Sequence, residues 1–168
     1  ARPKLTILQC IPKSDRLKEA IELMVEAGAD EIIPWSAERS ISKWQKDSKE
    51  KWESAALASA KQAKRFSIPK IAEQVDISKF LNEKAGSFAT IVLHERGGIK
   101  LSQLISEKMA ELDEIVLVIG PEGGITDTEL ALFEKSGARL AQMGEAIFRS
   151  AHAGGFAIAA ISTLLKRW

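Results

Sequence analysis

Short apolar runs alternate along the chain with segments in which apolar residues recur every three or four positions. The short runs predict buried strands, and the three-to-four spacing predicts helices with one apolar face. Strands are expected at 5–9, 31–34, 70–72, 88–93, 115–119 and 138–143, and helices at about 14–27, 47–63, 76–84, 101–110, 126–136 and 150–167. This alternation is typical of a mostly parallel sheet covered by helices, so the predicted fold class is α/β.

Several residues mark the expected helix ends. Ser14 and Asp15 can cap the first helix, and Gly28 ends it. Two capping boxes are expected, Asp47 with Glu50 and Thr126 with Glu129, and Gly137 closes the helix that the second box begins. The helix after Asp47 is expected to present a small inward face of alanines around Trp52 and Leu57, made of Ala55, Ala56, Ala58, Ala60 and Ala63.

Composition fits one soluble globular domain spanning residues 1–168. The hydrophobic fraction is 45% and the charged fraction 28%. The single cysteine, Cys10, excludes an internal disulfide and a cysteine-based zinc site, which fits a reducing, cytoplasmic compartment. No apolar run approaches the roughly 20 residues of a membrane helix, so no membrane is expected. The first residues lack both a methionine and a secretion signal, so the sequence is expected to begin inside a longer chain.

Charge is unevenly distributed although the formal net charge is only +1. Residues 39–70 hold nine basic and three acidic side chains and so carry +6, which leaves −5 for the rest. Such a segment can attract the phosphates of a nucleic acid. A solvated helix face explains the same charges equally well.

The loop Gly120-Pro121-Glu122-Gly123-Gly124 is the strongest local candidate for a binding site. It follows the most apolar strand, and ligands bind at the carboxyl ends of parallel strands. Its glycines allow backbone amides to approach a ligand closely. The loop has no lysine, and Glu122 would repel a phosphate, so a neutral or cationic ligand such as S-adenosylmethionine suits it. A tight turn without function is the alternative.

A second candidate segment begins at Met143 and Gly144, after the next strand, and should lie beside the first loop. Ile147 and Phe148 could form apolar walls there. Arg149 stands among small and apolar residues, where a charge is costly unless it is paired or used. It is therefore either half of a structural ion pair or a functional group.

The two histidines are expected to be structural or to line a ligand. His94 ends a strand, and His152 lies one helical turn after Arg149. With two histidines and one cysteine far apart, no metal site is expected.

The sequence resembles the catalytic domain of the SPOUT methyltransferases, specifically the bacterial small-subunit ribosomal RNA (uridine-N3) methyltransferase E family. The motifs that carry the resemblance span nearly the whole chain: residues 12–16, 27–34, 38–40, 51–52, 60–65, 93–95, 119–124 and 143–149.

The resemblance implies a C-terminal trefoil knot, S-adenosylmethionine bound in the knot, and a homodimer. Arg149 matches the arginine associated with catalysis, and His152 could orient the base or accept a proton through water. The residues implied to line the cofactor are Leu93, His94, Glu95, Gly120, Pro121, Glu122, Gly123, Gly124, Met143, Gly144 and Ile147. Those expected near the RNA are Arg39, Gln62 and Arg65, with Lys43 from the same basic segment.

The implied activity is methylation of uridine N3 in the 16S RNA of the small subunit. Two features depart from the family. Its usual N-terminal PUA-like β-barrel domain is absent from this chain, and Ser150-Ala151-His152-Ala153 replaces the usual Thr-Glu-Thr-Ala. Three alternatives therefore stay open: a transfer-RNA 2′-O-ribose methyltransferase, a non-catalytic RNA-binding module and, more distantly, an α/β enzyme acting on small molecules.

Overall fold

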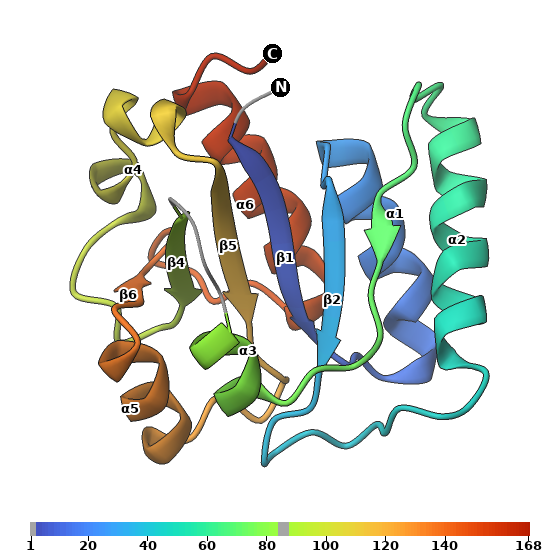
Figure 1. Cartoon of the computed structure of the whole chain (residues 1–168), viewed down its shortest axis with the longest axis horizontal. Coiled ribbons are helices and arrows are strands. Elements are labelled where there is room, and N and C mark those ends of the chain that lie inside the picture. The colour runs from blue at the N-terminus through green and yellow to red at the C-terminus, as the bar shows by residue number, and fades with distance from the viewer. Residues whose placement is uncertain (1–2, 84–87) are drawn as a thin grey trace.

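A computed structural model describes residues 3–83 and 88–168, which form one six-stranded sheet with helices on both faces (Figure 1). The strands are β1 (Lys4–Cys10), β2 (Glu31–Trp35), β3 (Lys70–Ile71), β4 (Phe88–Leu93), β5 (Glu114–Ile119) and β6 (Arg139–Ala141). The helices are α1 (Leu17–Ala27), α2 (Ser48–Gln62), α3 (Ile77–Glu83), α4 (Leu101–Leu104), α5 (Asp127–Lys135) and α6 (Ser150–Leu164), with 3-10 turns η1 (Ser14–Arg16) and η2 (Glu107–Glu111). The strand order is β3-β2-β1-β5-β4-β6 and every pairing is parallel, which confirms the predicted class.

Alternating side chains of the strands build two cores, one on each face. In β5, Ile115 and Leu117 belong to the core shared with α1, α2 and α6. Val116 and Val118 belong to the other core, which α5 and α3 cover. All these positions are almost completely buried, as expected for a parallel sheet covered on both sides.

Two glycines let α6 approach α1 unusually closely. A Cβ on Gly155 would lie 2.8–2.9 Å from Leu23, including its backbone carbonyl, and one on Gly154 would lie 3.1 Å from the Met24 side chain. The two helices therefore pack with little freedom to slide, and the start of α6 has a fixed position at the end of the sheet.

The expected helix over 101–110 is wrong as one element. The chain turns at Ile105 and Ser106, both in extended conformation, so that α4 ends at Leu104 and η2 begins at Glu107. The turn allows Leu104 and Ile105 to be buried together. The last strand and last helix are also shorter than expected, and Lys84 of the third expected helix lies outside the described residues.

Two of the expected helix caps are not formed. Ser14 and Asp15 lie in η1, and the side chain of Asp47 pairs with Lys51 at 2.8 Å instead of capping α2. The box of Thr126 and Glu129 is confirmed, with both hydrogen bonds present.

The small face of α2 is only partly as expected. The buried positions are Trp52, Ala56, Ser59 and Ala60, whereas Leu57, Ala58 and Ala63 are exposed. The helical repeat places positions 52, 56, 59 and 60 on one stripe and turns the exposed three away from it.

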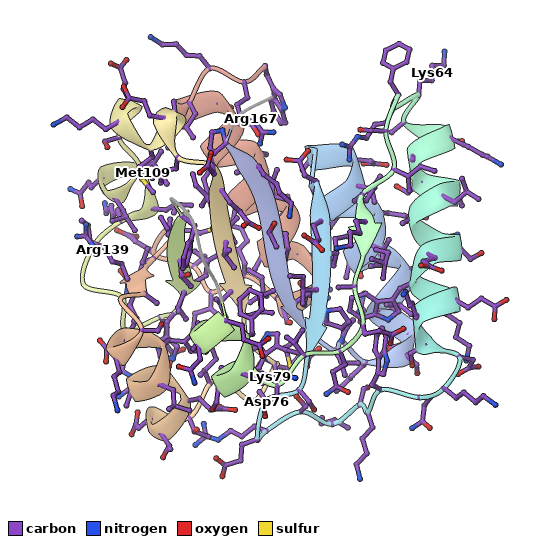
Figure 2. The ribbon with its side chains drawn as sticks, viewed as in Figure 1. Lys64, Asp76, Lys79, Met109, Arg139 and Arg167 are labelled. Carbon is purple, nitrogen blue, oxygen red and sulfur yellow. The ribbon has the colours of Figure 1, made fainter. Side chains whose placement is uncertain are left out.

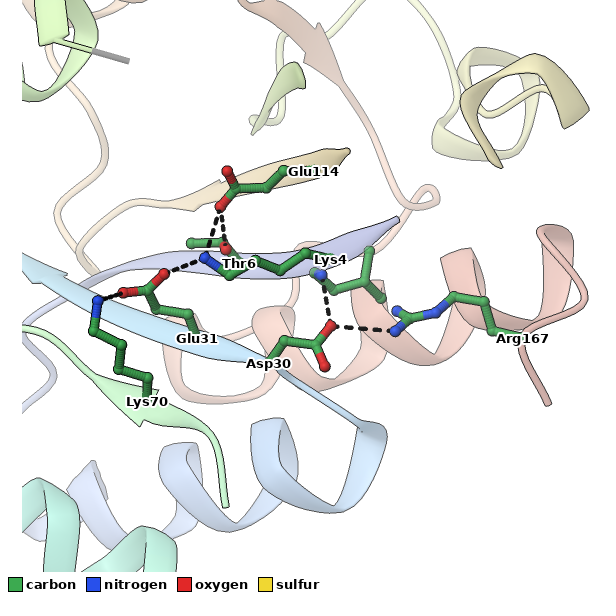
Figure 3. Close-up of polar contacts among 8 residues, drawn as sticks. Lys4, Thr6, Asp30, Glu31, Lys70, Glu114 and Arg167 are labelled. Atoms are coloured by element: carbon green, nitrogen blue, oxygen red, sulfur yellow. Dashed lines mark hydrogen bonds and ion pairs between the residues drawn. The ribbon is translucent and has the colours of Figure 1, made fainter. Parts of the chain in front are cut away.

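Charged side chains gather at the amino ends of β1, β2 and β5 (Figure 3). Buried Glu31 pairs with Lys4 and with Lys70, the latter at 2.9 Å. Asp30 accepts the backbone N–H of Leu5 at 2.8 Å and pairs with Arg167 at 3.2 Å. This network ties the chain after α6 to the start of the sheet and leaves the opposite edge for ligands.

Candidate active site

A cavity of about 760 Å³ opens at the carboxyl edge of the sheet, where β1, β4 and β5 end. The loop 120–124, the segment after β4 and the residues in front of α6 form most of its wall. A smaller hollow of about 120 Å³ adjoins it and shares Leu93, His94 and Glu95.

Every residue predicted to line the cofactor borders one of these two hollows. Leu93, His94, Glu95 and Ile147 border both, Gly120 to Gly124 the larger, and Met143 and Gly144 the smaller. The structure thus brings together three segments that are up to 54 positions apart in the sequence, from Leu93 to Ile147. That they hold a cofactor stays a prediction.

The loop after β5 has a shape that requires glycine. Gly124 has a φ of +83°, in the left-handed region that side chains disfavour. A Cβ on Gly120 would lie 2.5 Å from buried Ile125. Nη1 of Arg39 donates to the Gly123 carbonyl at 3.1 Å, which holds the loop from outside.

A buried hydroxyl joins this loop to α6. Ser150 Oγ donates to the Gly120 carbonyl at 2.7 Å and accepts from Gln9 Nε2 at 3.3 Å. One small side chain therefore connects the ends of β1 and β5 with the first turn of α6, next to Arg149.

Arg149 lies at the cavity wall immediately before α6 and is exposed. Within residues 3–83 and 88–168 its side chain forms no hydrogen bond or ion pair. The structural ion pair considered from the sequence is thus not found among these residues, and the guanidinium is free to meet a ligand.

The segment after β4, which borders the cavity, is held in place by two polar contacts. Arg96 pairs with Asp127 of α5, and Gln142 donates to the Glu95 carbonyl. His94 Nδ1 accepts the backbone N–H of Arg96 at 3.1 Å. Burial and the nearby Arg96 charge lower the pKa of His94, so its imidazole is neutral near pH 7.

Three cavity residues follow β1 and were not predicted: Lys13, Asp15 and Arg16. The rule that singled out the other loops also applies here, because parallel strands end at the same edge. The expected strand 5–9 lies at the centre of the sheet, so the residues that follow it could have been predicted to border the cavity.

The residues predicted to contact RNA divide between the two ends of the molecule. Arg39 borders the cavity, and exposed Lys43 lies on the connection from β2 to α2, along the same edge (Figure 1). Gln62 ends α2 at the opposite edge, near the labelled Lys64 of Figure 2. Arg65 donates there to the carbonyls of Val25 and Ala29, at 2.8 and 3.0 Å.

The structure does not bring His152 to the cavity wall, although Ala151 and Ala153 border it. Its Nε2 lies 2.8 Å from Oε1 of Glu19 on α1. The ring also contacts Phe156 edge-on, with centroids 6.0 Å apart.

No group of three or more His, Cys, Asp or Glu in 3–83 and 88–168 could hold a metal ion. No helix in those ranges is both long and apolar enough to cross a membrane.

A parallel sheet with glycine-containing loops at its carboxyl edge is an arrangement in which α/β proteins bind ligands. The chain belongs to the RNA methyltransferase domain family, which matches residues 1–162.

The ribosomal RNA small subunit methyltransferase E of Mycobacterium bovis is 33% identical to the chain, over 99% of it and 66% of the relative. A crystal structure of that methyltransferase from Neisseria gonorrhoeae bound to S-adenosyl methionine has a TM-score of 0.88 at 25% identity. It covers 97% of this chain and 67% of the other.

A SpoU methyltransferase from Streptomyces viridochromogenes shares the fold with a TM-score of 0.63, over 97% of this chain and 61% of the other; at 11% identity the likeness shows the fold alone. These comparisons confirm the expected family and its SPOUT fold class. The chain spans about two thirds of the length of the relatives that it matches.

Proposed function

We propose that this chain is the catalytic part of an S-adenosylmethionine-dependent methyltransferase that modifies N3 of a uridine in small-subunit ribosomal RNA. The observation that carries the proposal is Arg149, which is unpaired among residues 3–83 and 88–168 and lies at the rim of a cavity lined by two glycine-containing loops. The name of the Mycobacterium bovis relative and the S-adenosyl methionine bound to the Neisseria gonorrhoeae protein support it.

The residues of the two hollows fit this cofactor. Leu93, Met143 and Ile147 offer apolar walls to an adenine ring, and the glycine loop leaves backbone amides accessible. The carboxylates of Glu95 and Glu122 suit a ligand that carries a sulfonium and an ammonium group. When bound, the cofactor supplies an electrophilic methyl group.

Arg149 is the proposed catalytic residue. Uracil N3 carries a proton at neutral pH and must lose it for the nitrogen to attack the methyl carbon, while the carbon–sulfur bond breaks. Negative charge then develops on O2 and O4, and the guanidinium of Arg149 would stabilise it. His94 is neutral, so it does not stabilise this negative charge as Arg149 does. We infer that water takes up the N3 proton.

RNA would approach along the carboxyl edge. N3 lies on the pairing edge of uracil, so the base must be unpaired or extruded to enter the cavity. Arg39 at the rim and Lys43 on the adjoining connection would meet neighbouring phosphates. Gln62 and Arg65 could contact only a distant part of the RNA.

A second copy of the chain is part of the proposal. Ile147, Phe148 and Phe156 are 77%, 39% and 42% exposed, and the two phenylalanine rings stack edge-on at 5.2 Å beside the cavity. A homodimer would cover this apolar patch and help to enclose the ligand. The trefoil knot and a cytoplasmic location belong to the same proposal through the family.

The test is incubation of the protein with S-adenosylmethionine and unmodified ribosomal RNA, followed by mass spectrometry of the digested nucleosides. We expect 3-methyluridine. A ribose-methylated nucleoside would identify the alternative activity, and an absence of cofactor binding by calorimetry would favour a non-catalytic module.

Two variants separate catalysis from folding. Arg149→Ala should lower methyl transfer by about a hundredfold or more, the usual effect of removing one charge-stabilising donor, with cofactor affinity within a few-fold. Arg139→Ala, an exposed arginine of β6 outside both hollows, is the matched control and should act like the wild type. Turnover that survives in Arg149→Ala would remove this residue from the mechanism.

A further inference from the structure

A continuous polar chain runs from α6 through α1 to the cavity wall. Nε2 of His152 lies 2.8 Å from Oε1 of Glu19, and Oε2 of Glu19 accepts from Nη1 of Arg16 at 2.9 Å. Of these three residues, only Arg16 borders the cavity. The chain therefore ends in a guanidinium that faces the ligand space.

Glu19 is shared by two donors, which fixes its carboxylate. Hydrogen bonds from His152 and then Arg16 lower the pKa of Glu19, so the group is ionised near pH 7. The spacing between its helix and α6 is set by the close contact of Gly155 with Leu23. This packing sets the positions from which His152 and Glu19 reach each other.

Arg16 keeps most of its donors for a ligand. Its side chain is 42% exposed, and Glu19 is the one protein partner bonded to its side chain within the described ranges 3–83 and 88–168. A guanidinium has five N–H donors, so the donors that Glu19 does not use can bind an oxyanion in a bidentate manner.

Arg16 also belongs to a cationic rim. Lys13 of the same segment and Arg39, Arg96 and Arg149 from three other segments border the same cavity, together with the carboxylates of Asp15, Glu95 and Glu122. These five cations exceed the three carboxylates, so the opening carries a net positive charge that favours a polyanion at its rim.

On the basis of the proposed function, we propose that Arg16 binds a phosphate of the RNA beside the target nucleotide, and that Glu19 and His152 are positioning residues that aim it. His152 then acts through Glu19 and not on the reacting atoms. The arrangement gives this histidine, which replaces the threonine usual in the family, a defined role.

Fluorescence anisotropy with labelled ribosomal RNA at several salt concentrations tests the proposal without needing turnover. Arg16→Ala should weaken binding about tenfold at low salt and reduce the slope of log K against log salt by about one. Glu19→Gln and His152→Ala should weaken it several-fold in the same direction. His152→Gln, whose amide can still donate to Glu19, should restore it.

Glu22→Gln is the matched control, because Glu22 pairs with Lys18 on the same helix and does not border the cavity. It should bind RNA like the wild type. If His152→Ala binds RNA as Glu22→Gln does, the positioning role is wrong.

Calorimetry with S-adenosylmethionine distinguishes the other oxyanion that Arg16 could meet, the carboxylate of the cofactor. We expect every variant to bind the cofactor within twofold of the wild type. A weakened cofactor affinity in Arg16→Ala with unchanged RNA binding would overturn the proposal. A wild-type protein that binds RNA but forms no methylated nucleoside would count against the proposed function and leave this binding test intact.

Discussion

Ser150 offers the sharpest test of how the site is held together. Its buried hydroxyl is the link between the Gly120 carbonyl, at 2.7 Å, and Gln9, at 3.3 Å. Ser150→Ala removes only the hydroxyl group and creates no steric conflict. The change therefore isolates the hydrogen bonds that hold α6 against the end of β5.

The expected cost follows from what is left behind. The Gly120 carbonyl is only partly buried, so losing its partner should cost about 1–2 kcal/mol, in the lower part of the usual range. For a domain of this size that lowers the melting temperature by about 3–6 °C. Because Gly120 borders the cavity, we also expect the dissociation constant of S-adenosylmethionine to rise about three- to tenfold.

Urea unfolding and calorimetry measure the two effects. Thr163→Ala is the control, because its hydroxyl also donates to a carbonyl of α6, Ala159, at 3.0 Å but is exposed. It should change stability by less than about 0.5 kcal/mol. If Ser150→Ala is no less stable than Thr163→Ala, the hydroxyl does not hold the loop and the reasoning fails.

Three further predictions concern packing, acid and the far edge. Gly155→Ala should lower stability by about 1–3 kcal/mol in urea because its methyl group meets the backbone of α1, whereas Gly154→Ala, which meets only a flexible side chain, should be nearly neutral; equal effects would contradict this packing. Burial would raise the pKa of Glu31, but its two lysine partners outweigh burial and lower the pKa. The ionised group therefore stabilises the fold above about pH 4.3, and this contribution is lost as the pH falls through the lower pKa of the folded state. Glu31→Gln should therefore be less stable than the wild type at pH 7 by about 1–3 kcal/mol, with a gap that closes below about pH 4 in urea unfolding; a constant gap would refute the assignment. Arg65→Ala should lower the thermal midpoint because it removes two hydrogen bonds to α1 and the turn after it. RNA binding should stay within about twofold of the wild type. A large loss of RNA affinity without destabilisation would show that Arg65 binds RNA and has no structural role.

The sequence was sufficient to predict which segments meet. Parallel strands end at one edge, so the loops after β4, β5 and β6 had to be neighbours, and the structure places them around two adjoining hollows. Local chemistry was equally informative where it acts alone: Thr126 and Glu129 form their capping box, and Gly28 and Gly137 have positive φ at helix ends.

Features that depend on packing could not be predicted in this way. The turn at Ile105 exists because two neighbouring apolar side chains are both buried, which breaks the helical repeat. The contact between His152 and Glu19 depends on the close approach of two helices separated by most of the chain.

The position of Arg65 could have been predicted from length. A 15-residue helix is about 22 Å long, so α2 carries its last residues to the far side of the sheet. Motif matching alone placed this arginine near the RNA without considering that distance.

The direction of β1 has a consequence for any module joined ahead of it. The strand starts at Lys4, on the rim opposite the cavity, and its seven residues measure roughly 23 Å. A preceding module would be tethered a strand length from the chemistry. If such a module binds RNA, the part of the RNA that it contacts and the nucleotide in the cavity would lie at opposite edges of the sheet.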